Sequence, residues 1–378
     1  MKIEQRRWTN AEGWSPGPLR TSFVPQLAFI FGSRAVLESP IPFEEIKTIY
    51  PTALLFGCST AGEICGDQVL DDSLVVTAVE FQSTNIKSAN VRINSVGDSY
   101  QAGLELGSAL DKAGLVHILV LSEGLKINGN ELVKGLTSCL PNNVSVTGGL
   151  AADGSDFVST LVVGPEGRLE RQVAAVGLYG ERLKVGYGSM GGWDPFGPER
   201  LVTRSTANVL YELDGRSALK LYKQYLGVHA DELPASGLLF PLSLRGQGGG
   251  KGVVRTILSV SDEDQSMAFA GDIPEGSYVR LMKANFDRLI DGAVGAAEVS
   301  YEAIGSTAPE LALLISCVGR KLVLKQRIEE EVEGVREVLG RQTIFTGFYS
   351  YGEISPFAAT AKCELHNQTM TITTLSEV

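Results

Sequence analysis

Apolar residues in this chain gather in short runs that alternate with amphipathic stretches. Runs at residues 27–31, 53–56 and 116–121 have the length and composition of buried strands. Residues 98–112 and 285–303 instead carry apolar positions at helical spacing. The pattern therefore predicts strands and helices interleaved along the whole chain.

The remaining periodicity favours antiparallel strands over strand–helix–strand crossovers. Further strands are predicted at 74–81, 86–93, 144–147, 238–244, 253–260, 279–282, 311–316, 342–346 and 364–375, and further helices at 42–49, 130–138, 218–225 and 324–339. Residues 160–203 contain short strands separated by Gly turns, a pattern typical of hairpins. Residues 1–24, which are rich in Gly and Pro, are predicted to be an irregular lead-in. We predict an α+β fold of mixed, largely antiparallel sheets with flanking helices.

Two segments far apart in the chain share the frame Gly-x-x-Ser/Thr-x-Gly-Glu-Ile. They lie at residues 57–64 and 347–354, and each follows an apolar run. A second similarity occurs in the same order along the chain. One predicted apolar strand ends at Ser122, and another ends at Ser316. The simplest interpretation is two related halves, each of which ends two strands in a polar, Gly-rich tip.

These tips, together with three other segments, resemble FIST-domain proteins. The segments that carry the resemblance are 57–64, 148–154, 191–193, 349–354 and 365–369. The resemblance implies a FIST-N-like sensory domain at 25–218, a FIST-C-like domain at 219–378, and a small-ligand-binding module in signal transduction. A subset of stand-alone members of that family looks like haem-dependent nitric-oxide sensors that act on histidine kinases.

Composition and charge narrow the remaining classes of function. The net charge of -11, from 33 basic and 44 acidic residues, disfavours nonspecific nucleic-acid binding. The five cysteines are scattered and form no Cys-x-x-Cys pair, which favours reduced thiols in a cytoplasm. The N-terminal residues lack the apolar core of a signal peptide, and the run at 115–121 is too short to span a bilayer. We expect a cytoplasmic protein without membrane insertion.

The polar residues of the tips are the candidate ligand contacts. Glu63 and Glu353 each follow a Gly in a turn after a strand, where a carboxylate beside hydroxyl groups can hold the polar head of a ligand. The alternative is that each Glu bonds backbone amides and so closes its own turn. The predicted ligand-binding set is Ser59, Thr60, Glu63, Ser122, Gly149, Asp153, Trp193, Tyr349, Ser350, Glu353 and His366.

The main prediction is a sensor that binds a small ligand, such as an amino acid or similar metabolite, and signals to a sensor kinase or another separate partner. The first alternative is a haem-binding nitric-oxide sensor, whose axial ligand would be a neutral imidazole. His229 and His366 are preferred for that role over His117, which alternates within an apolar strand. The sequence does not choose between haem and no cofactor.

Two further alternatives come from other classes of protein. A hydrolase could use Cys58 or Ser122 as its nucleophile, but neither residue has a recognisable base within its motif. A scaffold that binds only other proteins would show no ligand-induced change in melting temperature. The sequence contains no complete catalytic constellation, so we do not expect an enzyme.

Overall fold

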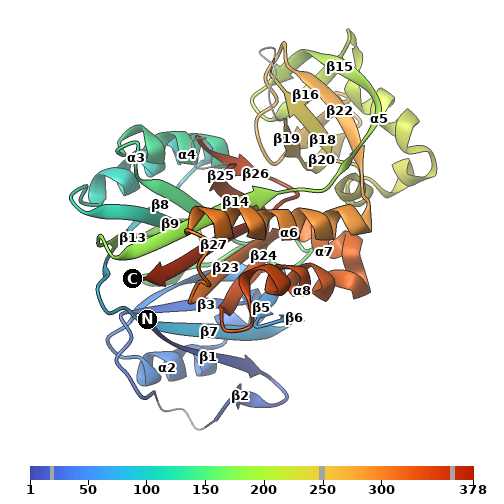
Figure 1. Cartoon of the computed structure of the whole chain (residues 1–378). Coiled ribbons are helices and arrows are strands. Elements are labelled where there is room, and N and C mark those ends of the chain that lie inside the picture. Colours follow the sequence, from blue (N-terminus) through green and yellow to red (C-terminus); the bar gives the residue numbers. More distant parts are fainter. Residues whose placement is uncertain (18–20, 247–251, 358–361) are drawn as a thin grey trace.

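Three segments of the chain fold into the same order of strands and helices (Figure 1). The computed structural model describes residues 1–17, 21–246, 252–357 and 362–378. Each unit contains a first strand, a parallel strand–helix–strand pair, a short hairpin and a final antiparallel strand. The prediction of two related halves is therefore replaced by three related units.

The bounds of the elements follow this order in each unit. Unit 1 contains β1 (Lys2–Thr9), β2 (Gly13–Ser15), β3 (Leu27–Ser33), α1 (Arg34–Glu38), α2 (Pro40–Ile49), β4 (Leu54–Thr60), β5 (Glu63–Cys65), β6 (Gln68–Leu70) and β7 (Ser73–Glu80). Unit 2 contains β8 (Asn85–Arg92), η1 (Val96–Asp98), α3 (Ser99–Ala109), β9 (Leu115–Ser122), α4 (Gly129–Ser138), β10 (Ser145–Leu150), β11 (Val162–Gly164), β12 (Gly167–Leu169) and β13 (Gln172–Tyr179). Unit 3 contains β14 (Leu183–Met190), α6 (Phe286–Ala303), β23 (Leu311–Cys317), α7 (Val318–Leu324), η4 (Lys325–Arg327), α8 (Ile328–Leu339), β24 (Ile344–Ser350), β25 (Gly352–Pro356), β26 (Cys363–His366) and β27 (Met370–Glu377).

Each unit builds one sheet, but its hairpin joins the sheet of a different unit. The orders are β12-β11-β4-β3-β7-β1-β2 in sheet 1, β26-β25-β10-β9-β13-β8 in sheet 2 and β6-β5-β24-β23-β27-β14 in sheet 3. The hairpin of unit 1 thus enters sheet 3, that of unit 3 enters sheet 2, and that of unit 2 enters sheet 1. We call these the exchange hairpins.

A glycine at the same register position in each unit allows the two parallel strands to lie close together. Gly57, Gly148 and Gly347 pair with Ile30, Val120 and Leu314, respectively. A Cβ atom on any of the three glycines would lie 1.7–1.8 Å from the carbonyl oxygen of its partner. Only glycine fits there, and the same requirement in all three units supports their structural equivalence.

The inner faces of the three sheets share one apolar core. Phe31 of sheet 1 stacks on Phe348 of sheet 3 with ring centroids 4.8 Å apart, and Leu119 of sheet 2 joins the same cluster. The outer faces are covered by helices, with α2 on sheet 1, α3 and α4 on sheet 2, and α6 and α8 on sheet 3 (Figure 1). The polar ends of the parallel strands therefore surround this closely packed apolar core.

A separate domain, residues 194–283, is inserted between β14 and α6 of unit 3. It contains β15 (Asp194–Thr206), β16 (Val209–Leu213), β17 (Arg216–Ser217), α5 (Ala218–Leu226), η2 (Gly227–Glu232), η3 (Ala235–Leu239), β18 (Leu242–Arg245), β19 (Val253–Arg255), β20 (Ile257–Ser261), β21 (Ser266–Phe269) and β22 (Tyr278–Lys283). Its eight-stranded sheet has its own apolar cluster, and the domain projects from the three-unit body in Figure 1. The paired strands β15 and β22 connect it to the body.

The predicted α+β class, with mixed and largely antiparallel sheets and flanking helices, is confirmed. The lead-in at 1–24 is less irregular than predicted, because β1 pairs with β7 along its whole length. The alternation of polar and apolar residues in this strand is masked by its many charged side chains. No helix in the described part of the chain is both long and apolar enough to cross a membrane.

Candidate functional site

The two predicted glutamates lie where one sheet meets the next. Glu63 is the first residue of β5 in sheet 3, and its carboxylate accepts hydrogen bonds from Thr60 and from Ser73, the latter at 2.5 Å. Ser73 begins β7 of sheet 1. The side chain of Glu63 therefore fastens sheet 3 to sheet 1.

Glu353 repeats this arrangement between sheets 2 and 3. It is the second residue of β25 and pairs with Gly149 of β10, and its carboxylate accepts a hydrogen bond from the Ser350 hydroxyl at 2.7 Å. The Thr369 hydroxyl and backbone N–H donate to the other oxygen at 2.9 and 3.2 Å. Register places Thr369 at the position that Ser73 occupies in unit 1.

We call each of these contacts between two sheets a joint. The joint at which the hairpin of unit 2 enters sheet 1 contains no carboxylate at the equivalent position. Register equates Val162 with the two glutamates and Gln172 with Ser73 and Thr369. Gln172 donates to the Val162 carbonyl at 3.4 Å, and its Oε1 has no partner among the described residues. Two of the three joints are thus polar clamps, whereas the third is held mainly by apolar packing.

Burial controls the protonation of both glutamates. It raises the pKa of Glu63 to about 7 and that of Glu353 to about 8, although the hydroxyl donors act in the opposite direction. Both side chains are completely buried. Each Glu closes its own turn through hydroxyl groups, and any ligand contact by either residue stays a prediction.

The other predicted contacts also take part in the internal structure of the body. The Asp153 carboxylate accepts hydrogen bonds from Tyr351 and from the backbone of residues 157–159. The remaining contacts are Ser59 with Leu161 N, Tyr349 with Glu331, Trp193 with the Gln368 carbonyl, and Gly149 against Ile315 and Phe348. Ser122 is buried, and its hydroxyl has no partner in the described part of the chain.

The histidines and cysteines are placed unfavourably for the alternative functions. His229 is exposed beside Phe240, and His366 is buried with its Nε2 2.7 Å from the Ser355 carbonyl. His117 is enclosed between Ser145 and Thr147. The described residues contain no group of His, Cys, Asp and Glu suited to a metal ion.

Cys58 cannot act as an activated nucleophile in this environment. It is completely buried, and burial raises the pKa of its thiol well above the ordinary value, with a further contribution from Glu63. The reactive form of a cysteine is the thiolate. The hydrolase alternative therefore loses its first candidate residue.

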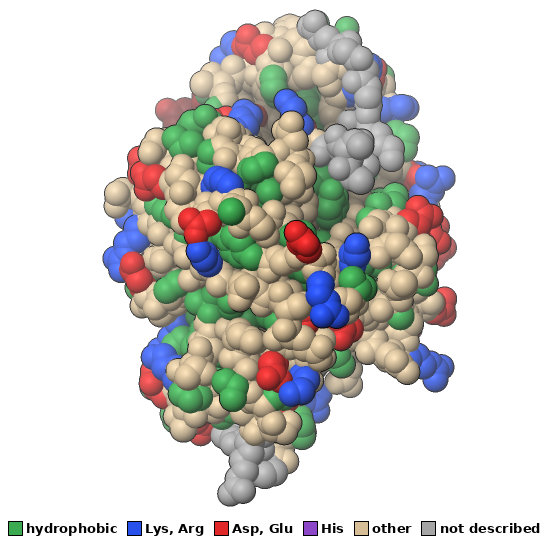
Figure 2. All heavy atoms as spheres, turned by 60° about the vertical axis from the view of Figure 1, so that its left-hand side comes forward, with side chains coloured by type: hydrophobic (Ala, Val, Ile, Leu, Met, Phe, Trp, Pro, Cys, Tyr) green, Lys and Arg blue, Asp and Glu red, His purple; other side chains and the backbone are tan. Residues whose placement is uncertain are grey.

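A cleft of about 1030 Å³ opens between the three-unit body and the inserted domain. Figure 2 shows this face, with the inserted domain at the top and side chains of both charges around the hollow beneath it. The body contributes α4, the segment from α4 to β10, β26 and Tyr187 of β14, and the inserted domain contributes β18, β19 and the loop that contains Asp272. Sites of this size commonly hold small molecules.

The end of the cleft next to the inserted domain is charged. Arg255 of β19 is almost completely buried there, and it donates to the Leu365 carbonyl at 3.0 Å and to the Asn130 side chain at 3.4 Å. Burial lowers the pKa of Arg255 to about 10, so the guanidinium stays charged at neutral pH. Asp272 accepts from Asn128, the N-cap of α4, at 3.0 Å and lies 3.9 Å from Lys134.

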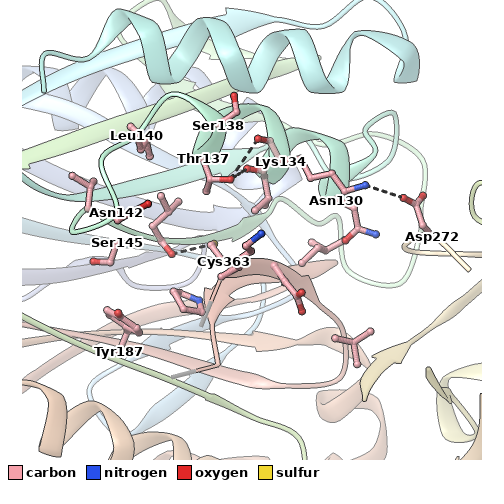
Figure 3. Close-up of a pocket in the computed structure, with 18 of the residues that line it drawn as sticks. Asn130, Lys134, Thr137, Ser138, Leu140, Asn142, Ser145, Tyr187, Asp272 and Cys363 are labelled. Atoms are coloured by element: carbon pink, nitrogen blue, oxygen red, sulfur yellow. Dashed lines mark hydrogen bonds and ion pairs between the residues drawn. The ribbon is translucent and has the colours of Figure 1, made fainter. Parts of the chain in front are cut away.

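The other end of the cleft carries neutral polar groups and an aromatic ring. Figure 3 shows Thr137, Ser145 and Asn142 on one side, with Tyr187 across from them and Asp272 at the far end. The Cys363 thiol, between the two ends, donates to the Val146 carbonyl at 3.3 Å. The cleft can therefore bind a ligand through hydrogen bonds and charge, and it contains no activated nucleophile among these residues.

None of the eleven residues predicted from the tips lines this cleft. The residues that do line it include Thr, Val, Asn and Lys side chains together with Arg255, Asp272 and Tyr187, and they form no motif in the sequence. These residues stand out only when the three units are aligned with one another. That alignment requires the register of the strands in the folded structure, which the sequence does not contain.

Comparisons with known proteins identify the two parts of the chain. Residues 26–216 match the FIST N domain, and residues 218–356 match the FIST C domain. An uncharacterised protein of Methanocaldococcus jannaschii is 22% identical over 346 residues, which cover 82% of this chain and 62% of that relative. The chain thus spans less than two thirds of that relative's length.

A solved structure is also similar to part of the chain. The crystal structure of cyanuric acid hydrolase from A. caulinodans matches 78% of this chain and 99% of its own, at 10% identity and a TM-score of 0.19. A score this low carries no argument about shared fold or activity.

Proposed function

Because the chain belongs to the FIST family, a sensory module of signalling proteins, we propose that it binds a small ligand in the cleft and passes the signal to a separate partner. The partner would be a sensor kinase or another signalling protein. All five cysteines are free, which supports a reducing compartment such as the cytoplasm.

The observation that carries this proposal is the position of the cleft between the three-unit body and the inserted domain. Its walls come from α4 and β26 of the body and from β19 and Asp272 of the inserted domain. A ligand that contacts both walls stabilises one arrangement of the two parts over others. The cleft therefore suits a sensor better than a rigid binding site would.

The connections of the inserted domain supply the coupling. Arg320, which is fully buried, forms an ion pair with Glu331 at 2.8 Å. It also donates at 2.6 Å to the carbonyls of Gly191, just before the domain, and of Leu289, just after it. Both connections are thus held by one side chain of unit 3, so a displacement of the domain is passed to the body beside sheet 3.

An amino acid or a similar metabolite fits the chemistry of the cleft. Lys134 and Arg255 can bind a carboxylate, and Asp272 and Glu364 can bind an ammonium group. The neutral end, near Asn142, offers hydrogen-bond partners for a side chain. Haem is not part of this proposal, because no histidine lines the cleft among the described residues.

The test is a thermal-shift screen of the purified protein against a library of metabolites. A ligand at a hundred times its Kd stabilises the folded state by about 2.7 kcal/mol, which gives a measurable rise in Tm. The variant Thr137→Trp fills the cleft and should abolish the shift.

Thr48→Trp is the matched control. Thr48 on α2 bonds the carbonyl four residues earlier, as Thr137 does on α4, but it lies outside the cleft. A ligand that shifts the wild type and both variants equally would refute the assignment of the cleft.

A further inference from the structure

The three-unit architecture provides three equivalent grooves, each between a helix and an exchange hairpin. The helices are α2, α4 and α8, which connect the two parallel strands of their units, and the hairpins are β11–β12, β25–β26 and β5–β6. Because the grooves are related by the fold, the group that fills a position in one groove indicates what the same position in another groove can hold.

In unit 3 the chain fills its own groove with an arginine. Arg336 of α8 stacks on the ring of Phe345, 3.5 Å from the ring centroid. Its guanidinium donates to the carbonyls of Gly340 and Thr343 at 3.0 and 2.5 Å and to Asp67 of the exchange hairpin at 2.6 Å. The groove thus binds a planar cation by an aromatic face, two carbonyls and one carboxylate.

In unit 1 an arginine fills the groove from the opposite side. Arg168 of β12 lies over the ring of Phe43 of α2, 4.2 Å from the centroid. Its guanidinium donates to the carbonyl of Leu37 and to that of Ser39, the latter at 3.0 Å. The kind of contact is similar, but these carbonyl groups precede α2, whereas those of Gly340 and Thr343 follow α8, so the two arginines lie at different ends of their grooves.

In unit 2 the inserted domain places Arg255 at one end of the groove, beside Leu365 and Asn130. At the other end, where Arg336 lies in unit 3, the described residues supply no arginine, and the cleft described above extends there. Thr137 stands eleven residues before Gly148, as Arg336 stands eleven before Gly347, so Thr137 is the counterpart of Arg336. Val146 is likewise the counterpart of Phe345. Both replacements remove volume, and both residues line the cleft.

A shared glycine supports this alignment of the helices. Gly135 and Gly334 each stand thirteen residues before the strand glycine of their unit. A Cβ atom on Gly135 would lie 2.0 Å from Tyr100 of the neighbouring helix α3, and one on Gly334 would lie 2.7 Å from Val294 of α6. The two helices therefore pack on equivalent partners with the same register.

The groove of unit 2 keeps the means to hold a planar cation. The carbonyl groups of Pro141 and Val144 are the counterparts of those of Gly340 and Thr343, by the same count along the chain. Register places Cys363 at the position of Asp67, and the neighbouring Glu364, which also lines the cleft, supplies a carboxylate there. Tyr187 of β14 brings an aromatic ring into the cleft in addition (Figure 3).

We propose that this cleft binds a small molecule through a guanidinium group, which takes the place of the arginine that the chain supplies in the groove of unit 3. The basic side chains Lys134 and Arg255 lie at the far end of the cleft and suit a carboxylate on the same molecule. The proposal rests on the proposed function and names the class of ligand for it.

The test compares L-arginine with L-citrulline by isothermal titration calorimetry on the full chain. Citrulline has the same shape but a neutral ureido group, so it should bind about tenfold more weakly or worse, the ratio expected when a charge-assisted hydrogen bond is lost. Equal affinities for the two compounds, or no binding of arginine, would overturn the proposal.

Variants test the equivalence of the grooves directly. Thr137→Arg should place a guanidinium in the cleft, raise the Tm of the free protein and abolish arginine binding, whereas Thr48→Arg should do neither. Arg336→Thr should open the groove of unit 3, lower the Tm, and be rescued by millimolar arginine but not by citrulline. A variant Arg336→Thr that both compounds stabilise equally would contradict the proposal.

These outcomes also separate the two levels of the argument. If another metabolite binds and Thr137→Arg blocks it while arginine does not bind, the cleft is the sensory site and the guanidinium is wrong. If Thr137→Arg changes the binding of no metabolite that stabilises the wild type, both the cleft and its ligand class are wrong.

Discussion

The replacement of Glu353 by Gln should make the protein less sensitive to alkaline pH. Glu353 is completely buried at the joint between sheets 2 and 3, where two hydroxyl groups and one backbone N–H donate to it. Gln has the shape of the protonated side chain but cannot ionise. The variant should therefore keep the joint while it removes the cost of burying a charge.

The magnitude follows from the difference in pKa between the folded and unfolded states. Burial raises the pKa of Glu353 from 4.5 to about 8. The folded state binds this proton more tightly, so the contribution to stability is complete below pH 4.5 and is lost as the pH rises towards 8. At about 1.4 kcal/mol for each pKa unit, the loss is on the order of 5 kcal/mol.

The assay is urea unfolding of the wild type and of Glu353→Gln between pH 5 and pH 9. Glu63, whose pKa is raised by burial to about 7, produces a second and smaller decline in both proteins. The wild type should therefore lose clearly more stability than the variant across this range, and the variant should be the more stable protein at pH 9. Glu337→Gln, on the exposed face of α8, is the control. Parallel stability curves for the wild type and Glu353→Gln would refute the reasoning.

Three further predictions follow from contacts in the body. Gly148→Ala should lower the free energy of unfolding by about 3 kcal/mol or more, because its Cβ would lie 1.8 Å from the Val120 carbonyl, whereas Gly246→Ala meets nothing within 4 Å and should have little effect in the same urea titration. Arg320→Met should cost about 3–5 kcal/mol, because it leaves the Glu331 carboxylate buried without its cation; a loss below about 1 kcal/mol in chemical denaturation would contradict this. In a Cys65→Ser/Cys139→Ser background, half-buried Cys363 should react with a maleimide before the buried thiols do, and a cleft ligand should slow that reaction in a mass-spectrometric time course.

The sequence predicted most of the elements because their apolar patterns are local. It merged β19 with β20 and β26 with β27, however, and it assigned to a strand residues 238–239, which lie in η3. It also located two of the three joints, since Glu63 and Glu353 both keep a hydroxyl-bearing residue three positions earlier. The third joint was missed because Ala151 and Val162 replace those residues and lie eleven positions apart. Two visible copies of a threefold pattern therefore suggested two halves.

The cleft could not be found from the sequence for a different reason. It exists because Thr137 and Val146 are smaller than Arg336 and Phe345 at equivalent positions of the fold. Small side chains at these two positions form no recognisable motif. Their comparison with Arg336 and Phe345 needs the register of the parallel strands. The polar tips were conspicuous in the sequence because polar groups that are buried at joints need specific partners, whatever their role in ligand binding.

The exchange hairpins also decide when this protein can finish folding during its synthesis. Strand β10 has its outer edge covered only by β25, about two hundred residues later, and β14 pairs with β27 at the end of the chain. A ribosome that has released the first two units therefore exposes a sheet with an open edge, a feature that promotes aggregation. The boundary between the two family domains, at residues 216–218, falls inside the inserted domain. It therefore separates strands that pair with one another in the three sheets. A fragment that ends there would lack β24, β25 and β27, the partners of its strands β5, β10 and β14, so the chain is best expressed as a whole.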